Sequence, residues 1–144
     1  MDGTGPLIED IAIAGPLRGK LHHAATPPRT VALINGATGV PARFYAGFAG
    51  WLAQTQGIAC LIWDYRDFGL SGSPRRSAAT MTDWGVTDPQ VARDWLGARF
   101  PKADLWVIGH SLGGMTLPFQ TGLDRIARVI TVASGPVHLS DHPW

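Results

Sequence analysis

The stretch that decides the fold lies at residues 105–113, where the chain has the sequence LWVIGHSLG. Its first four residues are a short apolar run, which is typical of a β-strand covered on both faces of a sheet. The next five fit the pattern G-x-S-x-G, and residues 112–123 are expected to form a helix with a kink at Pro118. This motif carries a nucleophilic serine when a strand precedes it and a helix follows it. Ser111 is therefore the candidate catalytic residue.

The small residues on either side of Ser111 allow such a turn to form. Gly109 and Gly113 remove the side chains that would clash where the chain reverses from strand to helix. The turn presents Ser111 at the carboxyl end of the strand, near the positive end of the following helix, which favours a negatively charged oxygen. The alternative is a strand–helix turn that merely contains a serine. The combination of motif, strand and helix favours the nucleophile.

Strands and helices alternate through most of the chain. Apolar runs that predict buried strands occur at residues 30–34, 58–63 and 126–132, in addition to the run before Ser111. Helices are expected at residues 44–56 and 82–100, the second with a break or a new first turn at Pro89. In the first helix, four apolar side chains have helical spacing: Phe44, Phe48, Trp51 and Leu52. The alternation predicts an α/β fold with a parallel sheet and right-handed crossovers.

An antiparallel hairpin is expected ahead of this parallel sheet. Residues 7–14 and 17–23 have strand patterns, and Gly15-Pro16 between them is a turn signal. The chain has 144 residues, of which 45% are hydrophobic and 16% charged. This length and composition predict a single packed domain over residues 1–144.

Composition also excludes several classes of protein. The net charge is +1 and the basic residues are scattered, so nothing indicates a nucleic acid or an anionic membrane as partner. No apolar stretch approaches the ~20 residues that span a bilayer. The first residues do not resemble a signal peptide, and the single cysteine, Cys60, lies in an apolar run as a buried thiol would. These features predict a cytoplasmic protein. Neither metal-ligand spacing nor a P-loop is present, so no metal or cofactor is expected.

The sequence resembles α/β-hydrolases of the serine aminopeptidase and lysophospholipase type. Three segments carry the resemblance in the order that these proteins have. Residues 35–37 (NGA) follow a strand where relatives have their oxyanion loop, residues 64–72 (DYRDFGLSG) resemble their D-x-R-G-x-G-x-S loop, and residues 109–114 (GHSLGG) match their nucleophile elbow. The resemblance covers about residues 30–135. It implies a mostly parallel sheet flanked by helices.

The resemblance also implies an activity. Relatives hydrolyse an ester, thioester or amide through an acyl-enzyme on the serine, which is Ser111 here; esterase, lipase and aminopeptidase activities all fit. The backbone N–H groups of Ala37 and Leu112 would form the oxyanion hole. A small-molecule ester with a hydrophobic acyl group is the first expectation for the substrate. The motif residues that accompany these three are Gly109, His110, Gly113, Asn35 and Gly36.

Two positions depart from the pattern of the relatives. Asn35 stands where many relatives have histidine, and Asp67 stands where many have glycine. The first departure leaves the oxyanion hole intact, because the expected donor is a main-chain N–H. The second changes a turn. Within the same loop, Asp64 and Arg66 are expected to shape the backbone rather than to catalyse.

A base for Ser111 and an acid that orients it are missing from the matched region. Relatives place both after later strands, so the resemblance covers only the N-terminal part of their domain and predicts a sheet that lacks its last strands. Asp141, His138 and His142 follow the last expected strand and are the candidate triad partners; the alternative is a polar tail. The isolated chain is expected to be impaired or inactive. The strand at residues 126–132 would be an open edge, prone to self-association.

Two other functions remain open. Residues 31–39 look like the first strand and glycine turn of an NAD(P)-binding Rossmann domain, with Asp64 as the ribose-binding acid. Against this, Ala42 replaces the last glycine, and the only lysines, Lys20 and Lys102, make no Tyr-x-x-x-Lys pair. The second alternative is a non-catalytic scaffold with the hydrolase fold. Ester hydrolysis that Ser111→Ala abolishes would exclude it.

Overall fold

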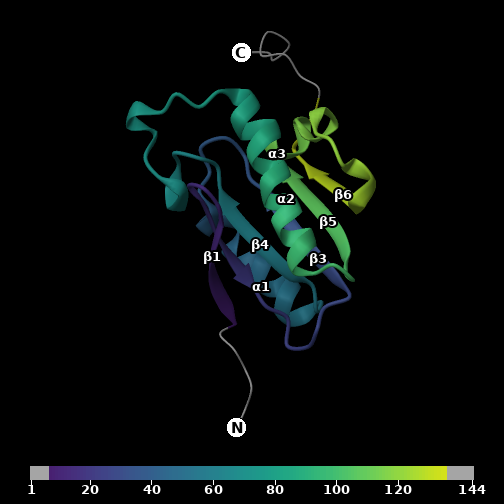
Figure 1. Ribbon diagram of the computed structural model, residues 1–144. Helices are drawn as coiled ribbons and strands as arrows, with labels where there is room; N and C mark the ends of the chain where they lie inside the picture. Colours follow the sequence, from purple (N-terminus) through teal and green to yellow (C-terminus); the bar gives the residue numbers. More distant parts are fainter. Residues whose placement is uncertain (1–6, 136–144) are drawn as a thin grey trace.

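The computed structural model describes residues 7–135, which form one six-stranded sheet with helices on both faces (Figure 1). The strands are β1 (Ile8–Ala14), β2 (Leu17–His22), β3 (Thr30–Asn35), β4 (Ala59–Asp64), β5 (Asp104–His110) and β6 (Ile126–Val132). The helices are α1 (Ala46–Thr55), α2 (Asp88–Arg99) and the single-turn α3 (Leu112–Met115). The α/β class and the N-terminal hairpin that the sequence predicts are confirmed.

The sheet runs in the order β1-β2-β4-β3-β5-β6. β1 and β2 pair antiparallel with each other, and β2 pairs antiparallel with β4, whereas β4, β3, β5 and β6 are mutually parallel. β3 therefore lies between β4 and β5, in the middle of the parallel strands. Their carboxyl ends meet at one edge of the sheet, and the loops that follow them meet there as well.

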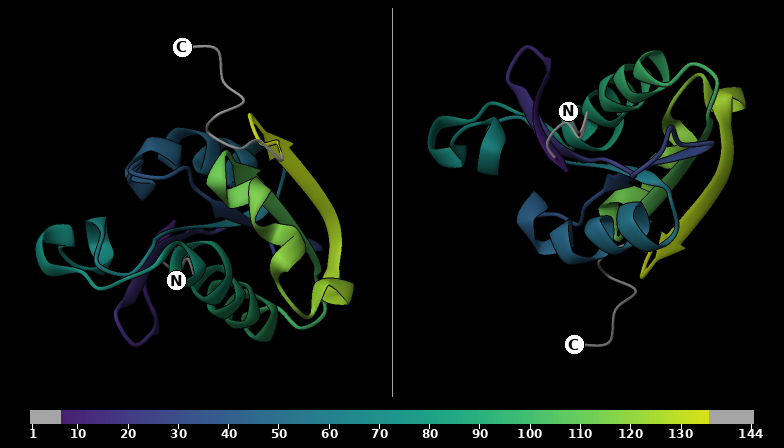
Figure 2. Two further views of the ribbon diagram at one scale, coloured as in Figure 1. Left: turned by 90° about the horizontal axis from the view of Figure 1, so that it is seen from above. Right: turned by 90° about the horizontal axis from the view of Figure 1, so that it is seen from below.

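Two hydrophobic clusters lie on opposite faces of the sheet. Because side chains alternate along a strand, Val31 and Leu33 of β3 pack on the α2 face, whereas Ala32 and Ile34 pack on the α1 face. Figure 2 shows α1 and α2 on opposite sides of the sheet. Burying a leucine of this kind stabilises a fold by roughly 1.5–3 kcal/mol. The central strands are therefore the rigid support for the loops at the carboxyl edge.

The helix expected at residues 44–56 differs from α1 in its buried face. A 3₁₀ turn at Ala42–Tyr45 precedes the helix, and small side chains face the sheet together with Leu52. The predicted apolar face was wrong for three aromatic residues, since Phe44, Phe48 and Trp51 are 68%, 45% and 50% exposed. Close packing of α1 on β4 needs small residues such as Ala49, which is why the aromatic side chains point away.

The two other expected helices are also shorter than predicted. A π-helical turn at Asp83–Thr87 precedes α2, so Pro89 lies in the first turn of a new helix, as one of the two sequence alternatives had it. The helix expected at residues 112–123 ends at Met115, and 3₁₀ turns occupy Leu117–Phe119 and Leu123–Arg125. Pro118 lacks an N–H and clashes with the preceding turn of an α-helix, which explains the early end.

β6 is the outermost strand of the described sheet beside β5. Every residue of β6 after Ile126 is exposed, including Val129, Ile130 and Val132. An apolar strand with one unpaired edge is a template for pairing with another strand.

Candidate active site

A strained turn at the carboxyl edge of the sheet connects β5 to α3 at Ser111. Ser111 has φ 51° and ψ −114°, a conformation that costs a residue with a side chain about 1–3 kcal/mol. Its N–H donates to the carbonyl oxygen of Val132 at 2.9 Å, so β6 supports the turn from the side. Such strain persists only where the surrounding structure enforces it.

The glycines of the motif are required by close backbone contacts. A Cβ at Gly109 would lie 2.5 Å from the carbonyl oxygen of Gly113, and a Cβ at Gly113 would overlap the carbonyl of Asn35. The loop after β3 and the turn after β5 therefore touch through their main chains. This contact fixes the position of Ser111 relative to residues 35–37.

Ser134 follows β6 and also supports the turn, although sequence reasoning missed it. Its hydroxyl donates to the carbonyl oxygen of Ser111 at 2.9 Å and fills the space that a side chain at Gly114 would need. A serine just after an exposed strand carries no recognisable sequence signal, because its partner lies 23 residues away.

The loop after β3 is held by both tyrosines of the chain. The Ala37 N–H donates to the Tyr45 hydroxyl at 2.9 Å, and the Tyr65 hydroxyl donates to the Gly36 carbonyl at 2.6 Å. The Tyr45 hydroxyl also lies 2.9 Å from Nδ1 of His110, the residue before Ser111. Neither tyrosine was a sequence candidate. A hydrogen bond between residues 37 and 45 depends on a loop geometry that no spacing rule predicts.

Asn35 contributes to this region as a buried support. It is 1% exposed, and its side-chain oxygen accepts the Trp63 indole N–H at 3.1 Å. Its main chain packs against Gly113. Asn35 thus joins the two loops, and its own side chain lies below them in the sheet.

The loop after β4 is fixed by Asp64. One carboxylate oxygen accepts the Ala42 N–H at 2.8 Å and the other accepts the Leu70 N–H at 2.9 Å. The hydroxyl of Ser71 donates to the Asp64 carbonyl at 2.6 Å. These bonds are structural, in agreement with the sequence expectation for Asp64.

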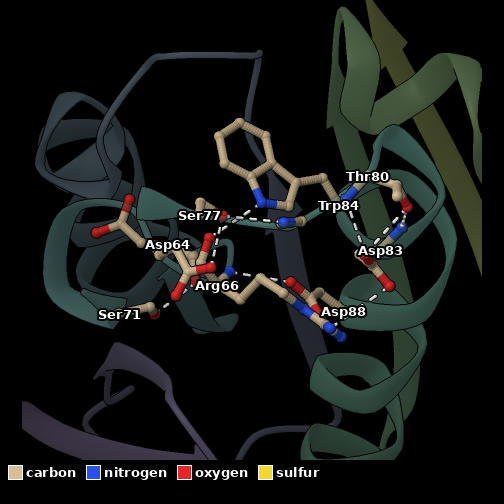
Figure 3. Close-up of polar contacts among 10 residues, drawn as sticks. Asp64, Arg66, Ser71, Ser77, Thr80, Asp83, Trp84 and Asp88 are labelled. Atoms are coloured by element: carbon tan, nitrogen blue, oxygen red, sulfur yellow. Dashed lines mark hydrogen bonds and ion pairs between the residues drawn. The ribbon is translucent and has the colours of Figure 1, made fainter. Parts of the chain in front are cut away.

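Arg66 fastens the same loop to the start of α2 (Figure 3). Its guanidinium donates two hydrogen bonds to Asp88, at 2.9 and 2.7 Å, and its backbone N–H donates a third at 2.9 Å. Asp88 is only 1% exposed, so Arg66 provides the charged partner of a buried carboxylate. Asp67, the position at which the sequence departs from the resembled loop pattern, has φ 58° and accepts the Ser77 hydroxyl at 2.6 Å.

The histidines that the structure describes do not supply a base to Ser111. His22 pairs with Cys60 near the start of β4, at the opposite edge of the sheet, and His23 contacts Glu9 at 2.7 Å. His110 turns its Nδ1 to Tyr45. No hydrogen bond of the Ser111 hydroxyl occurs within residues 7–135. The candidate partners Asp141, His138 and His142 lie outside the described residues.

Residues 7–135 contain no group of three or more histidine, cysteine, aspartate or glutamate side chains placed to hold a metal ion. No described helix has the length and apolarity needed to cross a bilayer.

Comparison with models of known protein families identifies the family of the chain. A family model described as serine aminopeptidase, S33, matches residues 25–141 and therefore covers most of the sequence. The chain belongs to this family. Membership of the S33 family agrees with the motifs around Ser111 and leaves the dinucleotide-binding alternative without support. No match was found among curated protein sequences.

Solved structures show the same fold as this S33 family member. A serine hydrolase homologue from Coxiella burnetii has a TM-score of 0.70 at 18% identity, with 91% of this chain and 65% of that one covered. A lidless serine hydrolase from Xanthomonas campestris has 0.68 at 19%, with 95% and 68% covered. A carboxyl esterase from Bacillus coagulans has 0.68 at 14%, with 88% and 44% covered. The chain thus spans less than half of the esterase and about two thirds of the other two.

Proposed function

We propose that the chain carries the nucleophile of a serine hydrolase that cleaves an ester, thioester or amide through an acyl-enzyme on Ser111. The observation that carries the proposal is the strained backbone of Ser111 in the turn between β5 and α3. Close backbone contacts leave no room for a side chain at the neighbouring Gly109 and Gly113, so the turn requires glycine at both positions. A fold that maintains such strain at a serine, in a family of serine peptidases, is well explained by a nucleophile.

The proposed reaction has two steps. The Ser111 Oγ attacks the carbonyl carbon, its proton passes to a base, and the alcohol, thiol or amine leaves with a proton. Water then attacks the acyl-enzyme and releases the acid. No metal or organic cofactor takes part.

The oxyanion of each step needs hydrogen-bond donors. Leu112 is the first residue of α3. Its N–H has no acceptor in the structure between residues 7 and 135. It supports the proposal as one donor. α3 has a single turn, so the macrodipole expected from a longer helix adds little. The Ala37 N–H, the other donor implied by the family resemblance, already donates to Tyr45.

We expect the isolated chain to be a slow enzyme, because the described residues bring no base to Ser111. Loss of the triad base can reduce turnover by about a millionfold, yet the oxyanion donors and binding alone leave roughly 10³–10⁴-fold acceleration over water. Activated reagents should therefore still react selectively at Ser111. His138 or His142, with Asp141, would raise the rate if they reach the serine.

A fluorophosphonate probe tests the proposal, because it phosphonylates an activated serine without requiring the natural substrate. Intact-mass and peptide-mapping spectrometry should find one adduct, on Ser111, and none in Ser111→Ala. Ser134→Ala is the matched control, since its hydroxyl supports the same turn but does not react. A folded wild-type chain without an adduct would support the alternative, a non-catalytic scaffold or fragment with the hydrolase fold.

The proposal also covers the substrate class and the cellular location of the protein. A small-molecule ester with a hydrophobic acyl group is the substrate class that we propose. The cytoplasm is the proposed location, in keeping with the fully buried free thiol of Cys60.

We also propose that β6 pairs with a further strand, in the simplest case from a second copy of the chain. Val132 of β6 and the exposed Phe44 and Phe48 line one apolar hollow of about 260 Å³. The end of the exposed strand and the aromatic side chains at the start of α1 therefore share an apolar surface, which favours association.

A further inference from the structure

One peptide group of the loop after β3 is hydrogen-bonded through both its carbonyl and its N–H. The peptide that joins Gly36 to Ala37 has its carbonyl bound by Tyr65, at 2.6 Å, and its N–H bound by Tyr45, at 2.9 Å. This N–H is the one that the family resemblance assigns to the oxyanion hole. In the folded chain this N–H therefore donates to the phenol oxygen of Tyr45.

The hydrogen bonds of the Tyr45 hydroxyl leave its own proton free for a second partner. The oxygen accepts from the Ala37 N–H, so the single hydroxyl hydrogen is directed elsewhere. Nδ1 of His110 lies 2.9 Å away and can take that hydrogen in the resting chain. An accepted hydrogen bond polarises a hydroxyl and strengthens it as a donor.

The Tyr45 ring is packed too tightly for a bound substrate to displace it from the Ala37 N–H. A Cβ at Gly36 would lie 2.9 Å from the ring, which therefore packs directly on that glycine. The rings of Phe44 and His110 contact it edge-on, with centroids at 5.2 and 5.9 Å. Burial raises the pKa of Tyr45, partly opposed by the Ala37 hydrogen bond, so the phenol keeps its proton at neutral pH.

We propose that the Tyr45 hydroxyl, polarised by the Ala37 N–H, is a donor to the oxyanion that forms at Ser111. It acts beside the Leu112 N–H and replaces the direct contact of Ala37. The phenol keeps its proton throughout, and the hydroxyl hydrogen turns from His110 to the developing oxyanion. This inference rests on the proposed function, because the oxyanion forms only if Ser111 is a nucleophile.

The test compares phosphonylation rates of Ser111 in the wild type, Tyr45→Phe and Tyr65→Phe. Tyr45→Phe keeps the ring and removes the donor, so the maximal rate should fall roughly 100-fold while the probe concentration for half-maximal rate stays the same. Tyr65→Phe removes the bond at the carbonyl of the same peptide. It should lower thermal stability and slow the reaction less than tenfold.

Each outcome decides between the two proposals. If the wild type reacts and Tyr45→Phe reacts equally fast or faster, the inference about Tyr45 is wrong and Ser111 remains the nucleophile. If the wild type does not react at Ser111, both are wrong. Should Tyr45→Phe fail to fold, protein with 3-fluorotyrosine at both tyrosines replaces it. Its more acidic phenols should change the maximal rate, and an unchanged rate would contradict a donor role.

Discussion

Ser111 holds a backbone conformation that its own side chain disfavours, and the neighbouring glycines make this possible. The turn is tight because the main chain at Gly113 lies against that of Asn35. The same contact joins the loop of β3 to the turn of β5. The geometry of the proposed nucleophile therefore depends on the absence of one methyl group.

Gly113→Ala should destabilise the chain strongly, by several times the ~1 kcal/mol of a typical substitution, because the new Cβ would overlap a backbone carbonyl that cannot move away. Gly47→Ala in α1 is the matched control. A Cβ there meets nothing within 4 Å, so this change should stabilise the chain by roughly 0.5–1 kcal/mol. Urea unfolding measures both, and equal stability of the two variants would contradict the account.

At the residue scale, the sequence predicted Ser111 but not its tyrosine neighbours. G-x-S-x-G is a local pattern whose spacing reflects backbone sterics. The bond between Ala37 and Tyr45 depends instead on how a loop returns to α1, and the bond between Tyr65 and Gly36 joins two different strands. Such contacts follow from tertiary packing.

At the scale of elements, the strands agree with the sequence prediction better than the helices do. The strands lie close to their predicted bounds, because buried parallel strands are continuous apolar runs. The helices were harder to predict. The aromatic spacing of α1 suggested a buried face that is exposed, and Pro118 ended α3 rather than kinking it. Packing on the sheet and one missing N–H outweighed helical periodicity.

The pair of Arg66 and Asp88 gives a prediction for the loop after β4. Arg66→Met would leave a buried carboxylate without its charged partner and should lower the free energy of unfolding by roughly 3 kcal/mol. Asp83→Asn is the control, because Asp83 contacts Arg66 only at 3.4 Å. It should have a much smaller effect. Denaturant unfolding that finds the two variants alike would show that the buried pair does not hold the loop.

β2 contributes a pH dependence through His22. Burial lowers the pKa of His22, as does nearby Lys20, so the folded chain binds fewer protons there than the unfolded chain. Stability should therefore fall as the pH drops below the ordinary histidine value of 6.5 and should continue to fall down to the lowered folded pKa.

His22→Leu should reduce this loss, which thermal unfolding between about pH 5.5 and 7.5 measures. His23 and its partner Glu9 are present in both proteins, so their contribution to stability cancels in the comparison. Identical pH profiles for the wild type and His22→Leu would assign the acid sensitivity to other groups.

At the scale of the whole described chain, residues 7–135 form a packed sheet with β6 exposed as an outer strand. The α/β class and the mostly parallel sheet could be predicted, because alternating strands and helices allow few topologies; the strand order comes from the structure alone. The position of an open edge could also be predicted, since the last apolar run becomes β6. The aromatic surface beside it could not, because that surface results from the rotation of α1 on the sheet.

Self-association through β6 is the prediction at this scale. Sedimentation velocity should show a wild-type sedimentation coefficient that rises with concentration. Val129→Lys, which places a charge on the exposed strand, should abolish the rise without unfolding the chain. A wild type that remains monomeric throughout, or a variant that associates equally, would exclude β6 as the interface.

The most direct test of the nucleophile is to look for the acyl-enzyme itself. Because the described residues 7–135 bring no base to Ser111, water should attack the acyl group slowly, so an acetyl group from p-nitrophenyl acetate should accumulate. We expect peptide mapping after acid quenching to find it on Ser111 and to find none in Ser111→Ala. Acetylation confined to lysines or other side chains, with Ser111 unmodified in a folded chain, would contradict the assignment of Ser111 as the nucleophile.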